Sequence, residues 1–199
     1  MIRRLMNSRL RRDERGATLT EFAFVAPVLI VMLMGIFDMA HTQYTAAQLN
    51  GAMQRAGRDL TLESAGSRQD TIDQAVIDQV KTVVPSNATV TLEKLSHFDF
   101  SDIGQAEQYV EESGDNTCNN GEVFDDSNGN GQWDANRGSA GVGGARDAVL
   151  YTATVEWPRL FPVAGLIGMS ENMTLEASTV LRNQPYDQQN RNVETGNCP

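Results

Sequence analysis

The sequence has few of the residues that carry most enzyme chemistry. Its 199 residues include two histidines, His41 and His97, and two cysteines. Neither histidine has a cysteine or an acidic motif near it at metal-ligand spacing, and no Gly-x-Ser-x-Gly, phosphate-loop or dinucleotide-binding motif occurs. The acidic residues show no pattern that would set two carboxyl pKa values apart. We therefore expect no enzymatic activity and no catalytic residue, with an anchored hydrolase as a remote alternative.

Basic residues are scarce outside the N-terminus. The chain has 16 Lys and Arg against 26 Asp and Glu, a net charge of -10. The first 15 residues alone carry six arginines and two acids, so this leader has a net charge of +4 and the remainder -14. Such an acidic remainder repels nucleic acid and anionic lipid. Nucleic acid is therefore not an expected partner, and cations fit better.

One apolar run, residues 16–37, contains a single carboxylate near its start, Glu21. A charged side chain in a membrane helix costs about 2.5–3.5 kcal/mol at the helix centre, so it is retained mainly where a partner neutralises it. If the chain is cut after Gly16, the new amine on Ala17 lies about one helical turn from Glu21, where the amine of a neighbouring copy could reach it. This is the type IV prepilin arrangement.

The leader, residues 1–16, sets the expected orientation. Its arginines keep it in the cytoplasm by the positive-inside rule, so the helix crosses the inner membrane once and the rest of the chain is periplasmic. A secretory signal would be cleaved after the apolar run, but Phe37-Asp38-Met39-Ala40 lacks the small residues that signal peptidase needs. An unprocessed anchor stays open, with Glu21 at the cytoplasmic interface and favoured there by the helix dipole.

The predicted span is long enough for a full crossing. Ala17 to Ala40 is about 24 residues, or about 36 Å of helix, against a hydrocarbon core of about 30 Å. Pro27 lies inside this stretch and predicts a kink, because it removes one backbone donor.

Within residues 15–57, three segments form one pattern: Gly16-Ala17-Thr18-Leu19-Thr20-Glu21-Phe22, Ala23-Phe24-Val25-Ala26-Pro27-Val28-Leu29 and Gly35-Ile36-Phe37-Asp38. This pattern resembles the N-terminal region of TadE-like proteins, which are pilin-like proteins of the tight-adherence (Flp) pilus system. The resemblance implies cleavage after Gly16 by a dedicated prepilin peptidase. It also implies that Glu21, followed here by Phe22 rather than tyrosine, acts in recognition and assembly, and that the product is a minor pilin or pseudopilin working with other pilin-like subunits and the assembly machinery.

The remaining periodicity predicts an α+β, pilin-like fold with a long N-terminal helix against a small, mainly antiparallel sheet. The helix continues over residues 17–62, with apolar or small residues at helical steps, and a periplasmic domain follows over residues 63–185. That domain begins with a second helix, which starts at the capping pattern Ser67-Arg68-Gln69-Asp70 and ends before Pro85. Strands are expected over residues 89–95, 147–157 and 173–181.

Two surfaces have open interpretations. Small residues spaced by four, Ala47 with Gly51 and Ala52 with Ala56, permit close approach either of another subunit's helix or of the protein's own sheet. The apolar connection 158–169 between two strands would be core if buried, and a partner or membrane contact if exposed.

The acidic, Gly- and Asn-rich insert, residues 101–146, contains the beginning of an EF-hand-type calcium loop. Its oxygen side chains occupy loop positions 1, 3, 5 and 9, a glycine stands at position 6, and Gln132 would contribute a backbone carbonyl. Arg137 stands at position 12 instead of glutamate, so the missing ligand would come from Asp125, Glu122 or water. No cofactor is required, and calcium is the one ion expected; the alternative is a flexible turn with solvated acids. The candidate ligands are Asp126, Asn128, Asn130, Gln132 and Asp134.

The cysteines, Cys118 and Cys198, predict one disulfide in an oxidising periplasm, with two free thiols as the alternative. The bridge would tie the polar tail, residues 186–199, to the insert. The sequence thus favours a minor pilin or pseudopilin. The alternative is an unprocessed, membrane-anchored binding module whose calcium loop engages an adhesin or another envelope partner.

Overall fold

The computed structural model describes residues 15–61, 68–161, 163–166, 168–184 and 193–199. These residues fall into two compact units. The first combines the chain up to Gln43 with Arg159–Glu171, and the second combines Tyr44–Pro158 with Asn172–Pro199.

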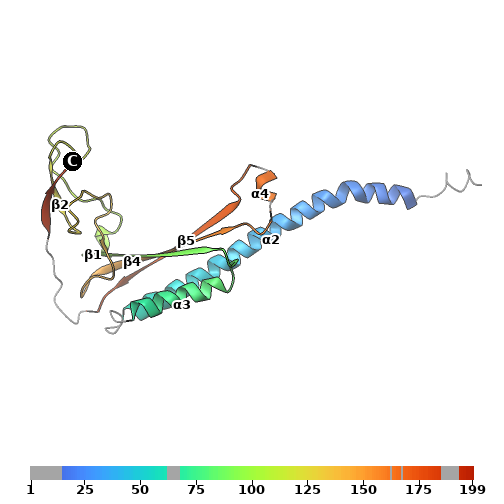
Figure 1. The fold of residues 1–199 in the computed structure, drawn as a ribbon, viewed down its shortest axis with the longest axis horizontal. Coiled ribbons are helices and arrows are strands. Elements are labelled where there is room, and N and C mark those ends of the chain that lie inside the picture. The colour runs from blue at the N-terminus through green and yellow to red at the C-terminus, as the bar shows by residue number, and fades with distance from the viewer. Residues whose placement is uncertain (1–14, 62–67, 162, 167, 185–192) are drawn as a thin grey trace, which may run out of the picture. The chain divides into compact units, whose positions relative to one another are not determined.

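The first unit contains most of one long helix and the segment Arg159–Glu171, which connects two strands of the sheet (Figure 1). Helix α2, Arg15–Leu60, has 46 residues, continues past Pro27 and extends into the second unit. This connecting segment contains the four-residue helix α4, Val163–Leu166. The predicted long N-terminal helix is therefore confirmed.

The second unit is built on a four-stranded antiparallel sheet with the order β3-β1-β4-β5. The two longest strands, β4 and β5, pair over their whole length, with Val149 opposite Leu181 and Val155 opposite Leu175. Alternate residues of β4 are buried, as the sequence pattern predicted, because successive side chains of a strand point to opposite faces. The strand bounds are Thr89–His97 for β1, Ser139–Ala140 for β3, Ala148–Pro158 for β4 and Asn172–Arg182 for β5.

The core lies where α2 and helix α3, Gln69–Lys81, meet the sheet (Figure 1). Helix α3 buries Ile72, Val76 and Val80, which confirms the predicted apolar face. Its beginning differs from the predicted capping pattern, since the N-cap residue is Arg68 and it forms no side-chain cap hydrogen bond. The buried core residues are Leu49, Ala52, Met53, Ala56, Leu60, Ile72, Val76, Val80, Val84, Val149, Tyr151, Ala153, Val155, Trp157, Ala177 and Leu181.

The insert adds a second, two-stranded sheet. Strand β2, Val123–Asp126, pairs antiparallel with the C-terminal strand β6, Glu194–Asn197. A short 3₁₀ helix, η2, covers Phe100–Asp102. The sequence pattern predicted no strand in the polar tail, because these four residues carry no alternation of apolar side chains.

A polar clamp joins α3 to the sheet. The Asp73 carboxylate accepts a hydrogen bond from the Tyr151 hydroxyl at 2.7 Å and pairs with the Lys94 ammonium at 2.6 Å. Tyr151 is fully buried, and this burial, together with its hydrogen bond to Asp73, raises the pKa of its hydroxyl. The hydroxyl therefore stays protonated and keeps donating to Asp73 at every physiological pH.

Replacing Asp73 with asparagine should lower the free energy of unfolding by about 1–3 kcal/mol, because the mostly buried Lys94 loses its counter-ion. The measurement is urea unfolding of the full chain in detergent, followed by circular dichroism. Asp78→Asn is the matched control, since Asp78 is an exposed carboxylate on the same helix. Equal midpoints for the two variants would contradict a stabilising role for the clamp.

Candidate functional site

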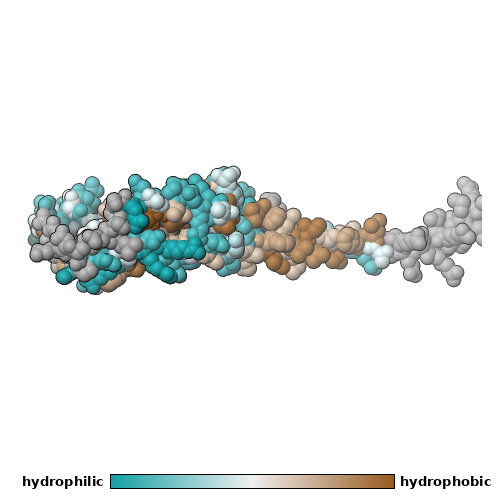
Figure 2. All heavy atoms as spheres, turned by 90° about the horizontal axis from the view of Figure 1, so that it is seen from below, coloured by the Kyte–Doolittle hydropathy of each residue, from teal (hydrophilic) through white to brown (hydrophobic). Residues whose placement is uncertain are grey.

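The N-terminal part of α2 presents an almost continuous apolar surface (Figure 2). Phe24 is 82% exposed and Met39 is 69% exposed. By length and composition, the helix from Thr18 onward can cross a membrane. The exposed large apolar residues here are Leu19, Phe22, Phe24, Val25, Val28, Leu29, Ile30, Val31, Met32, Leu33, Ile36, Phe37 and Met39.

The predicted processing and assembly residues lie at the beginning of this helix. The bond between Gly16 and Ala17 lies at the beginning of the described part of α2. Glu21 follows Ala17 by four residues, so the two positions share a helix face. The side chains of Glu21 and Phe22 are exposed, and Glu21 forms no ion pair with another residue of the described chain.

The C-terminal part of α2 uses its small residues against its own domain. Ala52 and Ala56 are buried in the core, while Ala47 is exposed. A Cβ on Gly57 would lie 3.2 Å from the Thr179 side chain of β5, so this helix and strand approach closely. Ala52 and Ala56 are thus used inside the protein, and a seam between copies stays a prediction.

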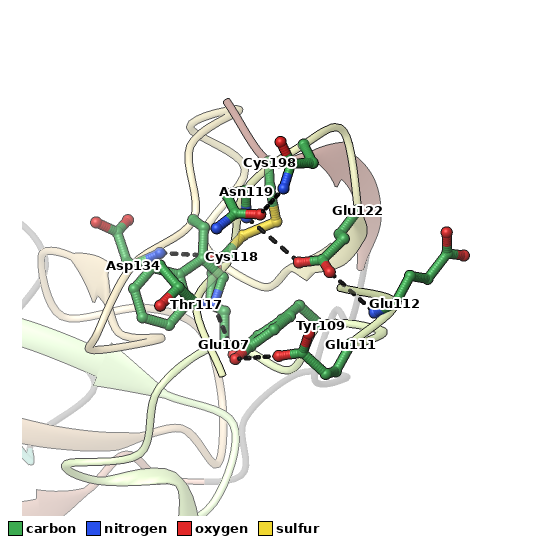
Figure 3. Close-up of a disulfide and its surroundings, with 12 residues drawn as sticks. Glu107, Tyr109, Glu111, Glu112, Thr117, Cys118, Asn119, Glu122, Asp134 and Cys198 are labelled. Atoms are coloured by element: carbon green, nitrogen blue, oxygen red, sulfur yellow. Dashed lines mark hydrogen bonds between the residues drawn. A yellow bond between two sulfur atoms is a disulfide. The ribbon is translucent and has the colours of Figure 1, made fainter. Parts of the chain in front are cut away.

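The acidic insert has a small core of its own around a disulfide (Figure 3). Cys118 and Cys198 are bonded, with their Cα atoms 5.3 Å apart and a sequence separation of 80, which confirms the predicted disulfide. Phe124, fully buried, packs beside it and lies opposite Gly196 across the β2–β6 pair. A Cβ on Gly196 would collide with the Phe124 ring, so glycine is required there.

Glu122 organises the loop that leads to the disulfide (Figure 3). Its buried carboxylate accepts hydrogen bonds from the backbone N–H groups of Glu112 and Ser113, both at 2.9 Å, and of Asn119 at 3.3 Å. These donors, Glu112 first, lower the pKa of Glu122 by stabilising the charged form. The Glu122 carboxylate is thus engaged in holding this loop, and its suggested role as a calcium ligand stays a prediction.

The loop predicted to bind calcium is folded around Asp126. The carboxylate of this buried residue accepts hydrogen bonds from the backbone N–H groups of Gly129 at 2.7 Å, Asn130 at 3.2 Å and Gly131 at 2.7 Å. Gly131, at loop position 6, has φ +77°, the left-handed conformation that glycine adopts without strain. The sharp turn expected of the motif is therefore present.

Two of the other predicted ligands, Asn128 and Asn130, meet at Asp134. The side-chain amides of Asn128 and Asn130 each donate to the same oxygen of Asp134 at 2.7 Å. The backbone N–H of Gln132 donates to the Asn130 side chain at 2.7 Å. The structure thus gathers two carboxylates and two amides in one loop, the hard oxygen donors that calcium prefers. Within the described ranges, no group of three or more His, Cys, Asp or Glu residues is placed to hold a metal ion.

Arg137, at position 12, does not face the loop's carboxylates. It donates to the Ala106 carbonyl at 2.8 and 3.1 Å and pairs with Asp102 at 3.2 Å. Asp125, the other suggested ligand, neighbours Asp126 on β2 and is exposed, so the two side chains leave opposite faces of the strand.

Sequence reasoning missed Glu107. This residue is 2% exposed, and its carboxylate accepts hydrogen bonds from the backbone N–H groups of Ser127 at 2.8 Å and Asp134 at 3.0 Å. Glu107 therefore bonds to the backbone near both ends of the Asp126 loop, at Ser127 and at Asp134. No spacing motif could have revealed this residue, because it precedes Ser127 by 20 positions and contacts the loop only through the fold.

The histidines do not form a catalytic arrangement. The Nε2 atom of His97 is 3.0 Å from the Asn136 side-chain oxygen, and its Nδ1 atom has no hydrogen-bond partner among the described residues. His97 lines a polar pocket of about 330 Å³ beside Arg137, which is itself held by Asp102. His41 lies on α2, in the other unit.

The apolar helix with one early carboxylate can be compared with known families. Residues 16–58 match the family model of TadE-like proteins. No curated protein and no solved structure matches the chain. The match links the N-terminal region to a function related to the Tad pilus, and TadE-like proteins are not known as enzymes.

The TadE-like region lies within α2 and stops before the domain's first strand. It includes Gly16, Ala17 and Glu21, whereas the disulfide and the Asp126 loop lie outside it. The family match therefore concerns the helix, and the insert has to be understood from its own contacts.

Calcium should stabilise the full chain if the Asp126 loop binds it. For a dissociation constant of about 0.1–1 mM, as in extracellular sites, 10 mM calcium adds about 1.4–2.7 kcal/mol, or a few degrees in melting temperature. Asp126→Asn and Asp134→Asn should abolish the rise. Asp125→Asn makes the same charge change on the exposed face and should keep it. If calcium leaves the melting temperature of the parent protein unchanged, the calcium site is disproved.

Glu122 should make the insert sensitive to acid. Its pKa in the folded protein is below the ordinary value of 4.5, so its stabilisation is complete above that pH and is lost as the pH falls through the lowered pKa. Glu122→Gln should therefore lower the free energy of unfolding at pH 7, and the gap from the parent should close at low pH. Chemical denaturation from pH 7 downward tests this. If the difference in free energy of unfolding between the parent and the variant does not change with pH, then the shape of this side chain, not its charge, stabilises the insert.

Proposed function

We propose that this chain is a minor pilin or pseudopilin of a tight-adherence (Flp) pilus, processed by a prepilin peptidase after Gly16. The observation that carries the proposal is the exposed Glu21, one helical turn after Ala17, on an apolar helix within the TadE-like region. The proposal includes anchoring in the inner membrane with a cytoplasmic leader and a periplasmic domain. The Cys118–Cys198 disulfide is in keeping with that compartment, because periplasmic proteins can form and retain disulfides.

In the proposed assembly step, cleavage frees the amine of Ala17, and Glu21 of a neighbouring copy pairs with it. The two charges are weakly solvated between apolar helices, so each stabilises the other more strongly than it would in water. The exposed aromatic and aliphatic side chains around them, such as Phe22 and Phe24, would pack against the neighbouring helix. The proposal covers both entry into the filament and priming of its assembly, since both use this helix. Its partners are the peptidase, other pilin-like subunits and the assembly machinery.

A second candidate is an unprocessed, membrane-anchored binding module. The observation that favours it is the insert, which has its own core, disulfide and folded Asp126 loop outside the TadE-like region. In this alternative the loop engages an envelope partner, and Glu21 is an interfacial charge. Neither candidate assigns a catalytic residue or requires a cofactor.

Intact mass separates the two candidates. The full chain is expressed with and without its own prepilin peptidase, extracted from membranes and weighed by mass spectrometry. We expect a peptidase-dependent product that begins at Ala17. A chain beginning at Met1 in both samples would favour the unprocessed module.

Glu21→Ala tests the pairing step separately. We expect membrane insertion to persist and the assembled fraction in sheared pili to fall by more than about tenfold, the factor that corresponds to about 1.4 kcal/mol. Thr20→Ala, at the adjacent position, is the matched control and should assemble. Normal pili from the Glu21→Ala protein would show that amine pairing is not the mechanism.

A further inference from the structure

The connection between β4 and β5 lies in the same unit as the apolar part of α2, and its described residues, 159–161, 163–166 and 168–171, form a closed tip (Figure 1). The backbone N–H of Arg159 donates to the Glu171 carbonyl at 2.8 Å, and its Nε donates to the Ser170 carbonyl at 3.0 Å. Inside the tip, the backbone N–H of Met169 donates to the Ala164 carbonyl at 2.9 Å. These contacts close the base of the tip and shape its end.

One ion pair fastens this tip to α2. The Arg159 guanidinium lies 2.6 Å from the Asp38 carboxylate, and each side chain is 16% exposed. Because the pair is mostly shielded from water and the two charges neutralise each other, it leaves no isolated charge at this point of the helix. The base of the tip is therefore held beside Asp38.

Asp38 marks a boundary on the helix. It is the first charged residue after Glu21, and the intervening surface is apolar and exposed. Ala17 to Asp38 corresponds to about 31 Å of helix, close to the hydrocarbon thickness of about 30 Å. If α2 crosses a bilayer as proposed above, Asp38 lies where the hydrocarbon ends and the headgroups begin.

The tip is apolar at that level, in a chain that is otherwise strongly acidic. Residues 160–169 contain no charged side chain. Leu160 is 45% exposed and Met169 is 54% exposed, whereas Ala164 is buried. The expectation that this connection is either core or contact surface is thus resolved in part: its described ends are exposed.

We propose that the exposed apolar residues of this tip, Leu160 and Met169, insert into the headgroup–acyl boundary of the membrane that α2 crosses. The inference rests on the proposed membrane anchoring. Its occupant is a lipid surface, since the ion pair of Arg159 places the base of the tip beside Asp38, where the exposed apolar part of α2 ends. The contact is apolar, so the negative charge of the rest of the chain does not oppose it in a zwitterionic bilayer. Because the tip contacts the lipid on one side of α2 only, it would restrict rotation of α2 about its own axis.

Fluorescence quenching by spin-labelled lipids tests the proposal. The full chain carrying Met169→Cys is labelled with an environment-sensitive dye, which is selective because the native cysteines are bonded to each other. It is reconstituted in phosphatidylcholine vesicles with a nitroxide near the headgroup or near the chain end. Val31→Cys on the span is the reference for crossing, and Ser178→Cys, exposed on β5, is the aqueous control.

We expect the dye at Met169 to be quenched more by the shallow nitroxide than by the deep one, with the reverse order at Val31 and no quenching at Ser178. Leu160→Cys should repeat the Met169 result, which guards against a local effect of one substitution. Quenching at both tip positions should persist at high salt, because apolar insertion is not screened.

Three outcomes would overturn the proposal. A quenched Val31 dye with a water-exposed Met169 dye would disprove the tip contact and leave membrane anchoring intact. A Met169 dye that is shielded from water but not quenched by lipid would show that protein, such as a second copy, covers the tip. An unquenched Val31 dye would disprove the anchoring itself, and the tip contact with it.

Discussion

The packing of α2 against the sheet is the constraint on which the second unit depends. From Leu49 to Leu60, one stripe of the helix supplies a large share of the buried core, and β4 buries alternate residues against it. Small residues are needed in that stripe, because the backbone approaches the sheet closely near Gly57 and Thr179. Between Glu21 and Asp38 the same helix is apolar and mostly exposed. A single element thus has two chemistries along its length, one suited to lipid or neighbouring helices and one suited to its own sheet.

The insert is stabilised by a different balance. Its core is only a few side chains around Cys118, Phe124 and Cys198, too few to order a long acidic segment by burial alone. Covalent closure and backbone hydrogen bonds to buried carboxylates supply the rest. Glu122 holds the loop before the disulfide, and Glu107 holds the loop around Asp126. Acidic residues are therefore structural here, since each accepts N–H groups that the irregular backbone would otherwise leave unpaired.

Paired charges fasten separate segments in both units. Asp73 joins α3 to Lys94 on β1, Asp38 joins α2 to Arg159, and Asp102 holds Arg137 within the insert. In each pair the partners are largely shielded from water, so losing one partner leaves the other poorly solvated. The pairs thereby specify which segments meet, in addition to any net stability they add.

The sequence by itself determined the features with local or countable signals. Periodicity of 3.6 and of 2 located α2, α3 and the three long strands, and two cysteines allowed one intramolecular pairing. The Asp126 turn followed from residue types within nine positions. Tertiary structure alone decided which distant groups meet: Arg159 with Asp38 across 121 positions, and Glu107 with the Asp126 loop. It also decided that β2 pairs with β6, whose four residues carry no pattern of their own. Such contacts cannot be recognised in the local sequence, because the sequence around a polar residue is the same whether its hydrogen-bond partner is water or a distant backbone N–H.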